Sequence, residues 1–502
     1  MSLKSLGAKM FAAITDKKTK KWATDPVGSQ DKVFKNLLKT AAGTAFAKAH
    51  SFSSIQTHKD FKQQVPVRDY EQLRPFVDRV VAGESDILWP GKPLYFAKTS
   101  GTTSGAKYIP LTKESMPEHI KAARNAILSY IHETGKAGFV DGKMIFLQGS
   151  PKMETKNGIQ LGRLSGIVAH YVPNYLQKNR LPSMKTNCID DWETKVEAVI
   201  DETLPEKMSV ISGIPSWVQM YFERIVQRTG KKVGEVFPDF NLFIYGGVNF
   251  EPYRAKFDQL IGRQVDSIEL FPASEGFFAY QDKQNEKGML LLLDAGIFYE
   301  FIPANQFHEE HPPRLSIGEV AIGINYVMII STTAGLWAYN IGDTIAFTST
   351  SPYRVMVTGR IKHYISASGE HVIGKEVEEA MKAASNELHI IINEFTVAPQ
   401  LNPENDALPY HEWFVEFGAI ADLDMLKLAQ ALDLQMREQN SYYDDLITGK
   451  ILQPLKITSV PQNGFKEYMK TIGKLGGQNK LPRLSNDRNI AEVLEKIIQQ
   501  NA

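Results

Sequence analysis

The stretch YFAKTSGTTSGAKYIPLTKES, residues 95–115, concentrates small residues, hydroxyls and lysines where a packed core could not use them. Hydroxyls that are buried without hydrogen-bond partners cost free energy. This stretch places four of them close together, at Thr99, Ser100, Thr102 and Thr103. The spacing predicts a strand over residues 94–97 and, after the stretch, a helix with Ser115 as N-cap and Pro117 in its first turn. We therefore expect the hydroxyls to bind a ligand.

The glycines of this stretch indicate that the ligand is a phosphate. Backbone amides exposed at Gly101 and Gly105, together with the hydroxyls and the ammonium group of Lys107, can cradle an anion. The stretch is not a P-loop, because GTTSGAK does not fit G-x-x-x-x-G-K-[ST] and Tyr108 takes the place of the magnesium-binding hydroxyl. The local motif leaves a second interpretation open, which is a surface loop without a ligand.

Composition places the chain among ordinary globular proteins with more than one domain. It has 502 residues, of which 43% are hydrophobic and 23% are charged. The formal net charge is +0, so no overall field would recruit nucleic acid or an acidic membrane, and we expect neither as a partner. The single cysteine, Cys188, excludes a disulfide framework and a cysteine-based zinc site, and it fits a reducing compartment.

The N-terminal segment predicts no targeting signal. Its apolar patch MFAAI is too short for a signal peptide, and the first arginine is Arg68, which argues against a transit peptide. No apolar run reaches the ~18 residues that a membrane span requires. We therefore expect a cytoplasmic protein.

Hydrophobic patterning in the first part of the chain predicts an α/β fold. Residues 1–90 have the spacing of helices. Short apolar runs then follow that are typical of buried strands, and the apolar segments after residue 288 indicate antiparallel strands. The buried strands are expected at residues 143–150, 241–248 and 266–274. Ligands of α/β sheets collect beyond the carboxyl ends of such strands.

The pattern changes near Arg360, where a small α+β module begins. It contains helices expected over residues 374–385 and 422–438, with strands between and after them. We therefore predict two domains: a large, multi-layer α/β domain with mixed sheets over 1–359, and a smaller, mobile α+β domain over 360–502. The hinge is expected near Arg360–Lys362.

Two strand ends in the N-terminal part carry candidate binding residues. YGGVNFEP (245–252) places Gly246 and Gly247 where another group can approach the backbone closely. FPASEGFFAYQD (271–282) ends the next strand with Ser274 and Glu275. A carboxylate in such apolar surroundings is either paired inside the protein or holds a cation, and the residues alone leave both interpretations open.

Further candidates are charged residues near glycines. Asp343, in LWAYNIGDTI (336–345), is expected after a glycine turn between two strands. Arg360 and Lys362 lie where the pattern changes, and Lys480 lies in the glycine-rich segment GGQNKLPR (476–483). Each has an ordinary interpretation as well: turn chemistry for the aspartate, a solvated linker for Arg360 and Lys362, and an exposed position for Lys480.

The order of these segments resembles the layout of adenylate-forming enzymes, which join a carboxylate to the α-phosphate of ATP and release pyrophosphate. Within that superfamily, long segments are similar to those of the auxin-responsive GH3 family of acyl acid–amido synthetases. KTSGTTSGAKYIPLTKE resembles the phosphate loop of that family, and FPASEGFF its SEG segment. Three later segments are also similar: LLLDAGIFYEFIP, TTAGLWAYNIGD and FKEYMKTIGKLGGQNKLPR. The resemblance extends from the first hundred residues to the last twenty.

The resemblance implies ATP and Mg²⁺ as cofactors and a role for each candidate residue. Glu275 would hold Mg²⁺, Asp343 would accept hydrogen bonds from the ribose, and Lys480 would stabilise the charge that develops on the α-phosphate. Thr103 would act with them in the phosphate loop. The other residues implied to contact ATP are Ser100, Gly101, Thr102, Gly105, Lys107, Gly246, Gly247, Val248, Phe271, Ala273, Ser274 and Arg360.

The residues that would bind the acid are harder to assign. Arg124, on the helix after the phosphate loop, could pair with a carboxylate, although an arginine on a helix is more often a solvated surface residue. Tyr171 and Trp217 could form aromatic walls of the pocket, or they could belong to the core. The plant members of the family also differ from this chain at one informative position, since His371 stands where they have a lysine. GRIKHYI also resembles the hinge of acyl-CoA ligases more than the plant version of this segment does. The identity of the nucleophile in the second step therefore stays open.

The sequence therefore predicts an ATP-dependent ligase, an acyl acid–amido synthetase that adenylates a small carboxylic acid and passes the acyl group to the amine of an amino acid. The first alternative is an acyl-CoA ligase, in which coenzyme A accepts the acyl group. The second is a nucleotide-binding sensor without turnover, against which the joint presence of Glu275, Asp343 and Lys480 argues.

Overall fold

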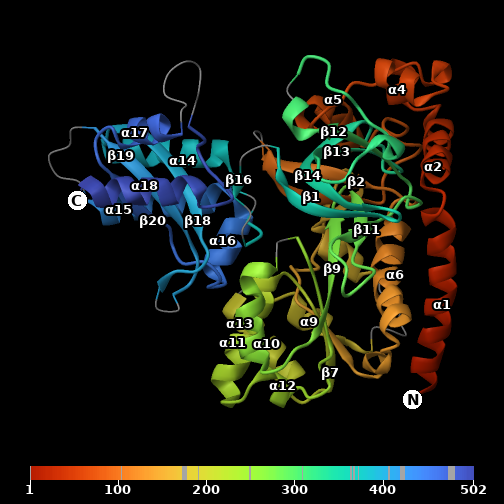
Figure 1. Ribbon diagram of the computed structural model, residues 1–502, viewed down its shortest axis with the longest axis horizontal. Coiled ribbons are helices and arrows are strands. Elements are labelled where there is room, and N and C mark those ends of the chain that lie inside the picture. The colour runs from red at the N-terminus through yellow and green to blue at the C-terminus, as the bar shows by residue number, and fades with distance from the viewer. Residues whose placement is uncertain are drawn as a thin grey trace. The chain divides into compact units, whose positions relative to one another are not determined.

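The protein is described by a computed structural model, and its chain divides into two compact units (Figure 1). One unit contains residues 1–102 and 106–361, and the other contains residues 103–105 and 362–502. The structure describes residues 2–102, 105–171, 178–189, 192–247, 250–307, 309–361, 364–365, 368–370, 372–404, 407–418, 424–472 and 481–501.

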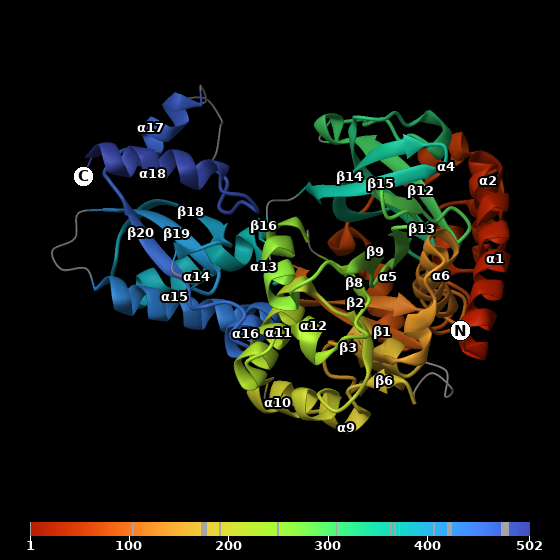
Figure 2. The same ribbon diagram turned by 60° about the horizontal axis from the view of Figure 1, so that its bottom comes forward.

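Helices dominate the first 81 residues, as the patterning predicts. They are α1 (Leu3–Ala23), α2 (Pro26–Ala41), α3 (Ala45–Ala49), α4 (His58–Gln64) and α5 (Tyr70–Val81). Each begins after a residue whose side-chain oxygen accepts a backbone N–H of the first turn. These capping residues are Ser2, Asp25, Thr44, Thr57 and Asp69. Figures 1 and 2 show α1 and α2 following one another along one side of the unit.

The main sheet of the first unit has eleven strands and is mixed. In spatial order they are β12 (Ile297–Pro303), β13 (Asn325–Thr332), β14 (Tyr339–Thr350), β15 (Tyr353–Arg360), β11 (Met289–Leu291), β10 (Gly276–Tyr280), β9 (Asp266–Ala273), β8 (Leu242–Gly246), β7 (Met208–Ser212), β3 (Lys143–Phe146) and β6 (Arg180–Leu181). The run from β9 to β6 is parallel, and the strands from β12 to β9 pair antiparallel. The three predicted buried strands and the antiparallel segments after residue 288 are therefore confirmed, while β7 had not been predicted.

A second mixed sheet of four strands, in the order β2-β1-β5-β4, carries the hydroxyl-rich stretch. Its strands are β1 (Tyr95–Thr102), β2 (Gly105–Leu111), β4 (Glu154–Lys156) and β5 (Ile159–Gly162). The remaining α-helices described in this unit are α6 (Met116–Thr134), α7 (Leu164–Ala169), α9 (Met184–Asn187), α10 (Trp192–Thr203), α11 (Pro215–Thr229), α12 (Val233–Val236) and α13 (Glu251–Ile261). Among the described residues, no helix is long and apolar enough to cross a membrane.

Among the residues that the structure describes, two apolar clusters hold the first unit together. The larger one joins α2 and the antiparallel strands around the buried Trp337 and Phe298, and it reaches β1 through Phe96 and Ala97. The smaller one packs the inner face of α6, with Ala126 and Tyr130, against β8, β9 and β10. The hydroxyl-rich stretch therefore rests on the same core as the antiparallel strands.

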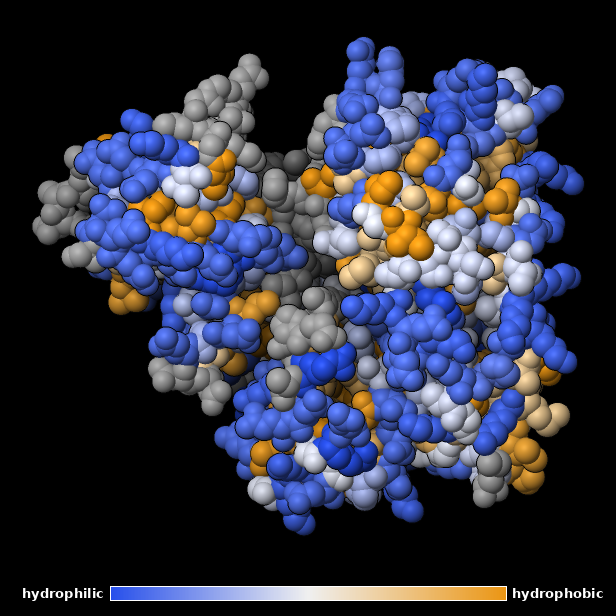
Figure 3. All heavy atoms as spheres, viewed as in Figure 1, coloured by the Kyte–Doolittle hydropathy of each residue, from blue (hydrophilic) through white to orange (hydrophobic). Residues whose placement is uncertain are grey.

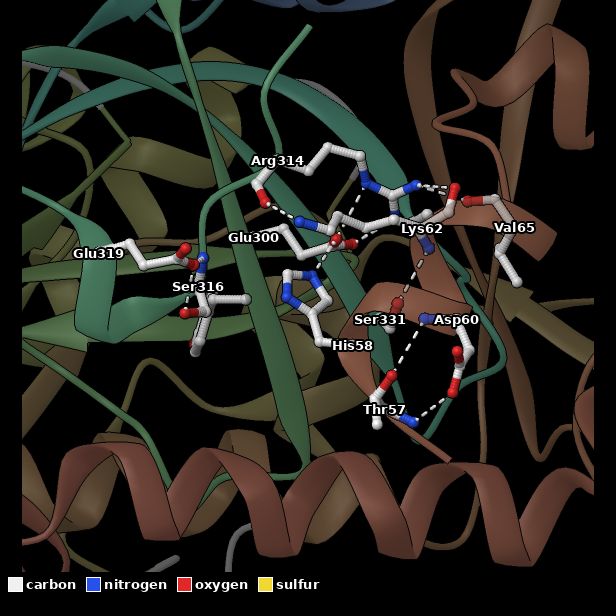
Figure 4. A network of polar contacts seen from close by, with 12 residues as sticks. Thr57, His58, Asp60, Lys62, Val65, Glu300, Arg314, Ser316, Glu319 and Ser331 are labelled. Atoms are coloured by element: carbon white, nitrogen blue, oxygen red, sulfur yellow. Dashed lines mark hydrogen bonds and ion pairs between the residues drawn. The ribbon is translucent and has the colours of Figure 1, made fainter. Parts of the chain in front are cut away.

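A buried ion pair fastens α4 to β12. Glu300, on β12, is 0% exposed and receives two hydrogen bonds from Arg314, at 2.9 and 2.6 Å. His58 Nε2 lies 2.7 Å from Glu300 Oε1, and Figure 4 shows the ring and the guanidinium both directed at this carboxylate. Arg314 also donates to the carbonyl of Val65 at 2.6 Å. Burial raises the pKa of Glu300, but the charge of Arg314 and the contact with His58 outweigh burial, so the pKa lies below its usual value.

The second unit is a small α+β module. Its mixed sheet contains β18 (Ile392–Gln400), β19 (Tyr410–Phe417) and β20 (Lys456–Val460), and a short antiparallel pair contains β16 (Tyr364–Ile365) and β17 (Val372–Ile373). The helices are α14 (Gly374–Glu387), α15 (Met425–Gln439), α16 (Ser441–Thr448), α17 (Gly464–Thr471) and α18 (Asn489–Asn501). The predicted helices and strands of this module are confirmed, and α16 to α18 are additions.

Glu370 and His411 form a buried pair inside this second unit. Glu370 is 0% exposed, and its Oε1 lies 2.8 Å from His411 Nε2 on β19. Its other oxygen accepts the backbone N–H of Ser368 at 2.8 Å. Burial raises the pKa of Glu370, but the hydrogen bond and the charge of the His411 ring lower it by more than burial raises it. The pKa therefore lies below its usual value, and the carboxyl group stays ionised. The pair holds residues 368–370 against the sheet.

The structure confirms a mixed α/β fold with mixed sheets. The division of the chain falls between Ile361 and Lys362. The mobility of the C-terminal part and its limits at 360–502 stay predictions.

Candidate functional site

The hydroxyl-rich stretch forms two strands of the second sheet. The strand predicted over residues 94–97 begins at Tyr95 and continues to Thr102, so Ser100, Gly101 and Thr102 belong to β1, and β2 begins at Gly105. The prediction that the strand ends at residue 97 is wrong, because strand pairing carries on through β-branched threonines, which suit strands. Thr103 lies outside the described residues.

Lys107 lies against Tyr70, a residue that is distant from it in the sequence. Its ammonium group lies 5.7 Å from the centre of the Tyr70 ring, on α5. The Tyr70 hydroxyl accepts the backbone N–H of Tyr108 at 2.8 Å, across 38 positions of sequence. Burial raises the pKa of Tyr70 to about 12, so the hydroxyl stays neutral. The side chain of Tyr108 has a partner of its own, since Lys156 Nζ donates to the Tyr108 hydroxyl at 3.2 Å.

Gly246 and Gly247 end β8 at the carboxyl edge of the parallel strands. Gly246 is the register partner of Leu270 on β9, and a Cβ atom at residue 246 would lie 2.5 Å from the Leu270 carbonyl oxygen. Gly247 has φ +85°, which disfavours any side chain, and no atom lies within 4 Å of the position that its Cβ would take. Val248 lies outside the described residues. Gly246 thus lets β9 pass closely, and Gly247 keeps the backbone accessible where ligands of α/β sheets bind.

Ser274 and Glu275 form the two-residue connection between β9 and β10, since Ala273 pairs directly with Gly276. Both are half-buried, as is Ala273, whereas Phe271 is buried. A connection this short fixes the backbone at the end of β9, the strand next to Gly246. The glycines and the Glu275 carboxylate therefore lie on adjacent strand ends.

Glu275 could hold a magnesium ion only together with water and the phosphates of a substrate. Among the described residues, no group of three or more histidine, cysteine, aspartate or glutamate side chains gathers as metal ligands. Mg²⁺ is commonly bound by one or two carboxylates together with water and substrate phosphates. A single carboxylate such as Glu275 fits that arrangement and does not fit an all-protein metal cage.

Asp343 lies inside a strand, which corrects the prediction of a glycine turn between two strands. It belongs to β14, and the register with β13 passes from Ile329–Asn340 to Val327–Thr344. Residues 341–343 therefore form a bulge, with Gly342 at φ +88°. Asp343 is 7% exposed, and its register partner on β15 is Arg360. The structure thus brings these two candidates together across neighbouring strands.

The candidate strand ends pack on the same hydrophobic core. The larger cluster includes Ala97 on β1, Phe271 on β9 and Ile341 beside Asp343, and Ala273 and Ile361 pack against it. Elements that share a rigid, close-packed core keep fixed positions relative to each other.

The residues predicted for the acid pocket lie on or next to different elements of the chain. Arg124 is exposed on α6, where it donates to Asn125 Oδ1 at 3.4 Å. Tyr171 lies with its ring 5.8 Å from that of Tyr95, and burial, together with a hydrogen bond to Tyr95, raises its pKa. Trp217 is half-buried in the first turn of α11. Their roles remain predictions.

Lys480 and His371 lie outside the described residues. Nothing in the described chain therefore bears on the catalytic lysine, and its role stays a prediction.

A small, mostly apolar cavity lies just beyond β3, and the sequence had not indicated it. It has a volume of ≈ 10 Å³, enough for one water molecule, and Gln148, Asn187 and Lys195 contribute its polar groups. Lys195, on α10, is 4% exposed and donates to the carbonyls of Asn187 at 2.9 Å and Gln148 at 3.3 Å. Gln148 Nε2 and Asn187 Oδ1 are buried without a partner. The cavity is too small for a substrate.

Family models match most of the chain in three successive stretches. The GH3 family N-terminal domain matches residues 16–187, the GH3 family central domain residues 290–360, and the GH3 family C-terminal domain residues 375–489. The matches contain β1, β14 and β15, and most of the second unit.

Curated relatives are similar over nearly the whole length. The indole-3-acetic acid-amido synthetase GH3.15 of Arabidopsis thaliana is 22% identical, covering 93% of this chain and 91% of its own. The jasmonoyl–L-amino acid synthetase GH3.5 of Oryza sativa subsp. japonica is 20% identical, covering 95% and 96%.

Two solved structures show the same fold. The AtGH3.15 acyl acid amido synthetase in complex with 2,4-DB has a TM-score of 0.63 at 17% identity, covering 97% of this chain and 96% of its own. A 2-hydroxyisobutyryl-CoA ligase in complex with 2-HIB-AMP and CoA has a TM-score of 0.57 at 14% identity, covering 96% and 92%.

Proposed function

We propose that this chain, which belongs to the GH3 family, activates a small carboxylic acid with ATP and then passes the acyl group to the amine of an amino acid. The observation that carries the proposal is the match of all three family domains in order along the chain. The glycines and the carboxylate on the ends of β8 and β9 support it, because they offer backbone and charge at the edge where a nucleotide would bind.

In the first step, a carboxylate oxygen of the acid attacks the α-phosphorus of ATP, an acyl adenylate forms and pyrophosphate leaves. The hydroxyls of Ser100, Thr102 and Thr103 and the amides of Gly101 and Gly105 would hold the phosphates. A bound Mg²⁺ would neutralise phosphate charge. Positioning and fixed charges can supply most of the catalysis of such a transfer.

The nucleoside would be bound by the strand ends. The backbone at Gly246, Gly247 and Val248 and the segment from Phe271 through Ala273 to Ser274 would border the adenine. Glu275 would hold the magnesium ion. These assignments use the open space beside Gly247 and the short β9–β10 connection.

Charged residues would bind the rest of the nucleotide. Asp343 would accept hydrogen bonds from the ribose hydroxyls, and Arg360, its register partner, would contact the ribose or the phosphates. Lys107 would contact a phosphate from β2. Lys480 would stabilise the charge that develops on the α-phosphate, and a hinge near Arg360–Lys362 would let the C-terminal domain move.

In the second step, the neutral amine of an amino acid attacks the acyl carbon, AMP leaves and the amine loses a proton. Arg124, Tyr171 and Trp217 stay candidates for binding the acid. Because water would hydrolyse the acyl adenylate, the intermediate has to be shielded until the amine arrives.

Coenzyme A is the second candidate acceptor. GRIKHYI is closer to the hinge of acyl-CoA ligases, and a 2-hydroxyisobutyryl-CoA ligase has the same fold as this chain. In that reaction the thiolate of coenzyme A would attack the same acyl carbon. A nucleotide-binding sensor without turnover is the third candidate.

The test of the first step is ATP–pyrophosphate exchange with Mg²⁺ over a panel of aryl, indolyl and short aliphatic acids. Exchange that depends on one class of acid is expected and would identify the acyl donor. Tight ATP binding without exchange for any acid would overturn adenylation and favour the sensor.

The test of the second step uses the acid identified in the first. AMP release is expected to accelerate with an amino acid and not with coenzyme A. Acceleration by coenzyme A alone would replace the amide product with a thioester.

A further inference from the structure

The outward face of α1 is apolar. Leu3 is 88% exposed, Leu6 51%, Met10 63% and Ile14 49%. These residues follow each other at three- and four-residue spacing, so they share one face of the helix. Phe11, 66% exposed, widens the same surface. Figure 3 shows apolar side chains gathered at the N-terminal end of α1 on the viewed face.

The opposite face of α1 is already occupied, so the apolar outward face is not needed for folding. Ser5 and Ala12 are buried, and Ala8 and Trp22 pack against the same cluster as α6. Ser5 also donates to the carbonyl of Ala137 at 3.1 Å. An apolar stripe exposed to water on a helix that is anchored by its other side marks a surface for a partner.

Charge identifies the kind of partner. The first 40 residues contain nine lysines and three aspartates, whereas the whole chain has equal numbers of basic and acidic residues. Lys17, Lys18, Lys20 and Lys21 follow the apolar stripe directly and are exposed. Asp16, the one acidic residue of α1, is paired with Lys20 at 2.7 Å and lies 3.2 Å from His132 Nε2.

We propose that α1 docks this protein on an anionic lipid surface, with Leu3, Leu6, Met10 and Ile14 in the boundary of the acyl chains and the lysines on the headgroups. A basic helix with an apolar face lies in the plane of such a surface without crossing the bilayer. The contact is peripheral and reversible. This proposal departs from the prediction of no membrane partner. That prediction used the zero net charge of the whole chain, whereas the positive charge here is local to α1.

A second copy of the chain fits the same face less well. In a parallel pair of α1 helices that met through their apolar stripes, the two sets of lysines would lie together. In an antiparallel pair, Lys17–Lys21 would also lie near the positive amino end of the partner helix. Both arrangements place like charges close to each other.

The test is co-sedimentation of the 502-residue chain with lipid vesicles at low salt. Binding is expected with phosphatidylcholine vesicles that contain about 30% phosphatidylglycerol, should be weaker with phosphatidylcholine alone, and should fall as salt rises. The combined change Leu6→Ser and Met10→Ser is expected to weaken binding at least about tenfold, because it removes apolar side chains from the contact.

The matched control is Leu434→Ser, which replaces an apolar residue that is 57% exposed on α15. Vesicle binding by this variant is expected to equal that of the unchanged protein. Thermal unfolding and ATP–pyrophosphate exchange show that both variants keep their fold.

Three outcomes would overturn the proposal. The first is no sedimentation with anionic vesicles at low salt. The second is binding that the Leu6→Ser and Met10→Ser variant retains. The third is a dimer in analytical ultracentrifugation that this variant loses while vesicles capture no protein, which would assign the face to a second copy.

Discussion

Glu300 is a carboxylate that has no access to water, and its two partners come from opposite sides of it. His58 reaches it from α4, and Arg314 reaches it with two parallel hydrogen bonds. Removal of charges from water is costly, and a buried pair recovers that cost only when its geometry is good. The intact network therefore need not add much to the free energy of unfolding, but the loss of one partner should lower it strongly.

At the residue scale, Arg314→Met should lower the free energy of unfolding by about 3–5 kcal/mol, because it leaves the Glu300 charge buried with His58 alone. Urea unfolding followed by circular dichroism measures the change. The double variant with Glu300→Met should be much closer to the unchanged protein. Arg79→Met, which removes an exposed pair with Glu84, should change the free energy of unfolding very little, because water screens an exposed pair. A loss for Arg314→Met as small as that of the control would contradict the interpretation.

The pH dependence of stability follows from the same carboxylate. Its pKa is lowered in the folded protein, so its contribution is present above the unfolded pKa of about 4.3 and is lost as pH falls through the folded pKa. Below about pH 4 the free energy of unfolding should therefore fall. The same pH series on Glu300→Gln should show a smaller fall, and equal slopes for the two proteins would rule out this group as a cause.

At the element scale, the end of β8 leaves no room for a side chain at residue 246 beside β9. Gly246→Ala would place a methyl group 2.5 Å from the Leu270 carbonyl, so the end of β8 would have to move. We expect ATP–pyrophosphate exchange to fall about 100-fold, because small displacements of a positioned site are costly. Gly43→Ala is the matched control, since no atom lies within 4 Å of its Cβ position, and it should leave exchange unchanged. Normal exchange by Gly246→Ala would remove this strand end from the site.

Elements were predictable from sequence where one local pattern decided them. The runs that became β3, β8 and β9 are apolar and short, and nothing competes with strand formation there. The bulge at residues 341–343 was not predictable, because glycine followed by aspartate is equally typical of a turn. The support of Lys107 by Tyr70 was also beyond sequence reasoning, since no local pattern links residues so far apart.

At the scale of the whole molecule, the proposed chemistry needs a residue from the C-terminal part of the chain. Lys480→Ala should reduce ATP–pyrophosphate exchange at least about 100-fold and leave ATP binding intact, because the lysine would act on charge that develops during the reaction. Lys466→Ala, an exposed lysine on α17 of the same unit, should change neither quantity. Unchanged turnover of Lys480→Ala would show that another group performs this role.

The bulge in β14 also bears on how insertions and deletions can be tolerated here. Residues 341–343 lie opposite Met328 alone, so two of the three are in excess of regular pairing. An even excess keeps every side chain before and after it on its own face of the sheet, whereas a single inserted or deleted residue would turn one side of the strand inside out. Length variants of one residue in β14 should therefore be eliminated by loss of the core. A two-residue deletion at the bulge that removes Asp343 should preserve the fold. The strand could therefore persist in a protein that has lost this carboxylate.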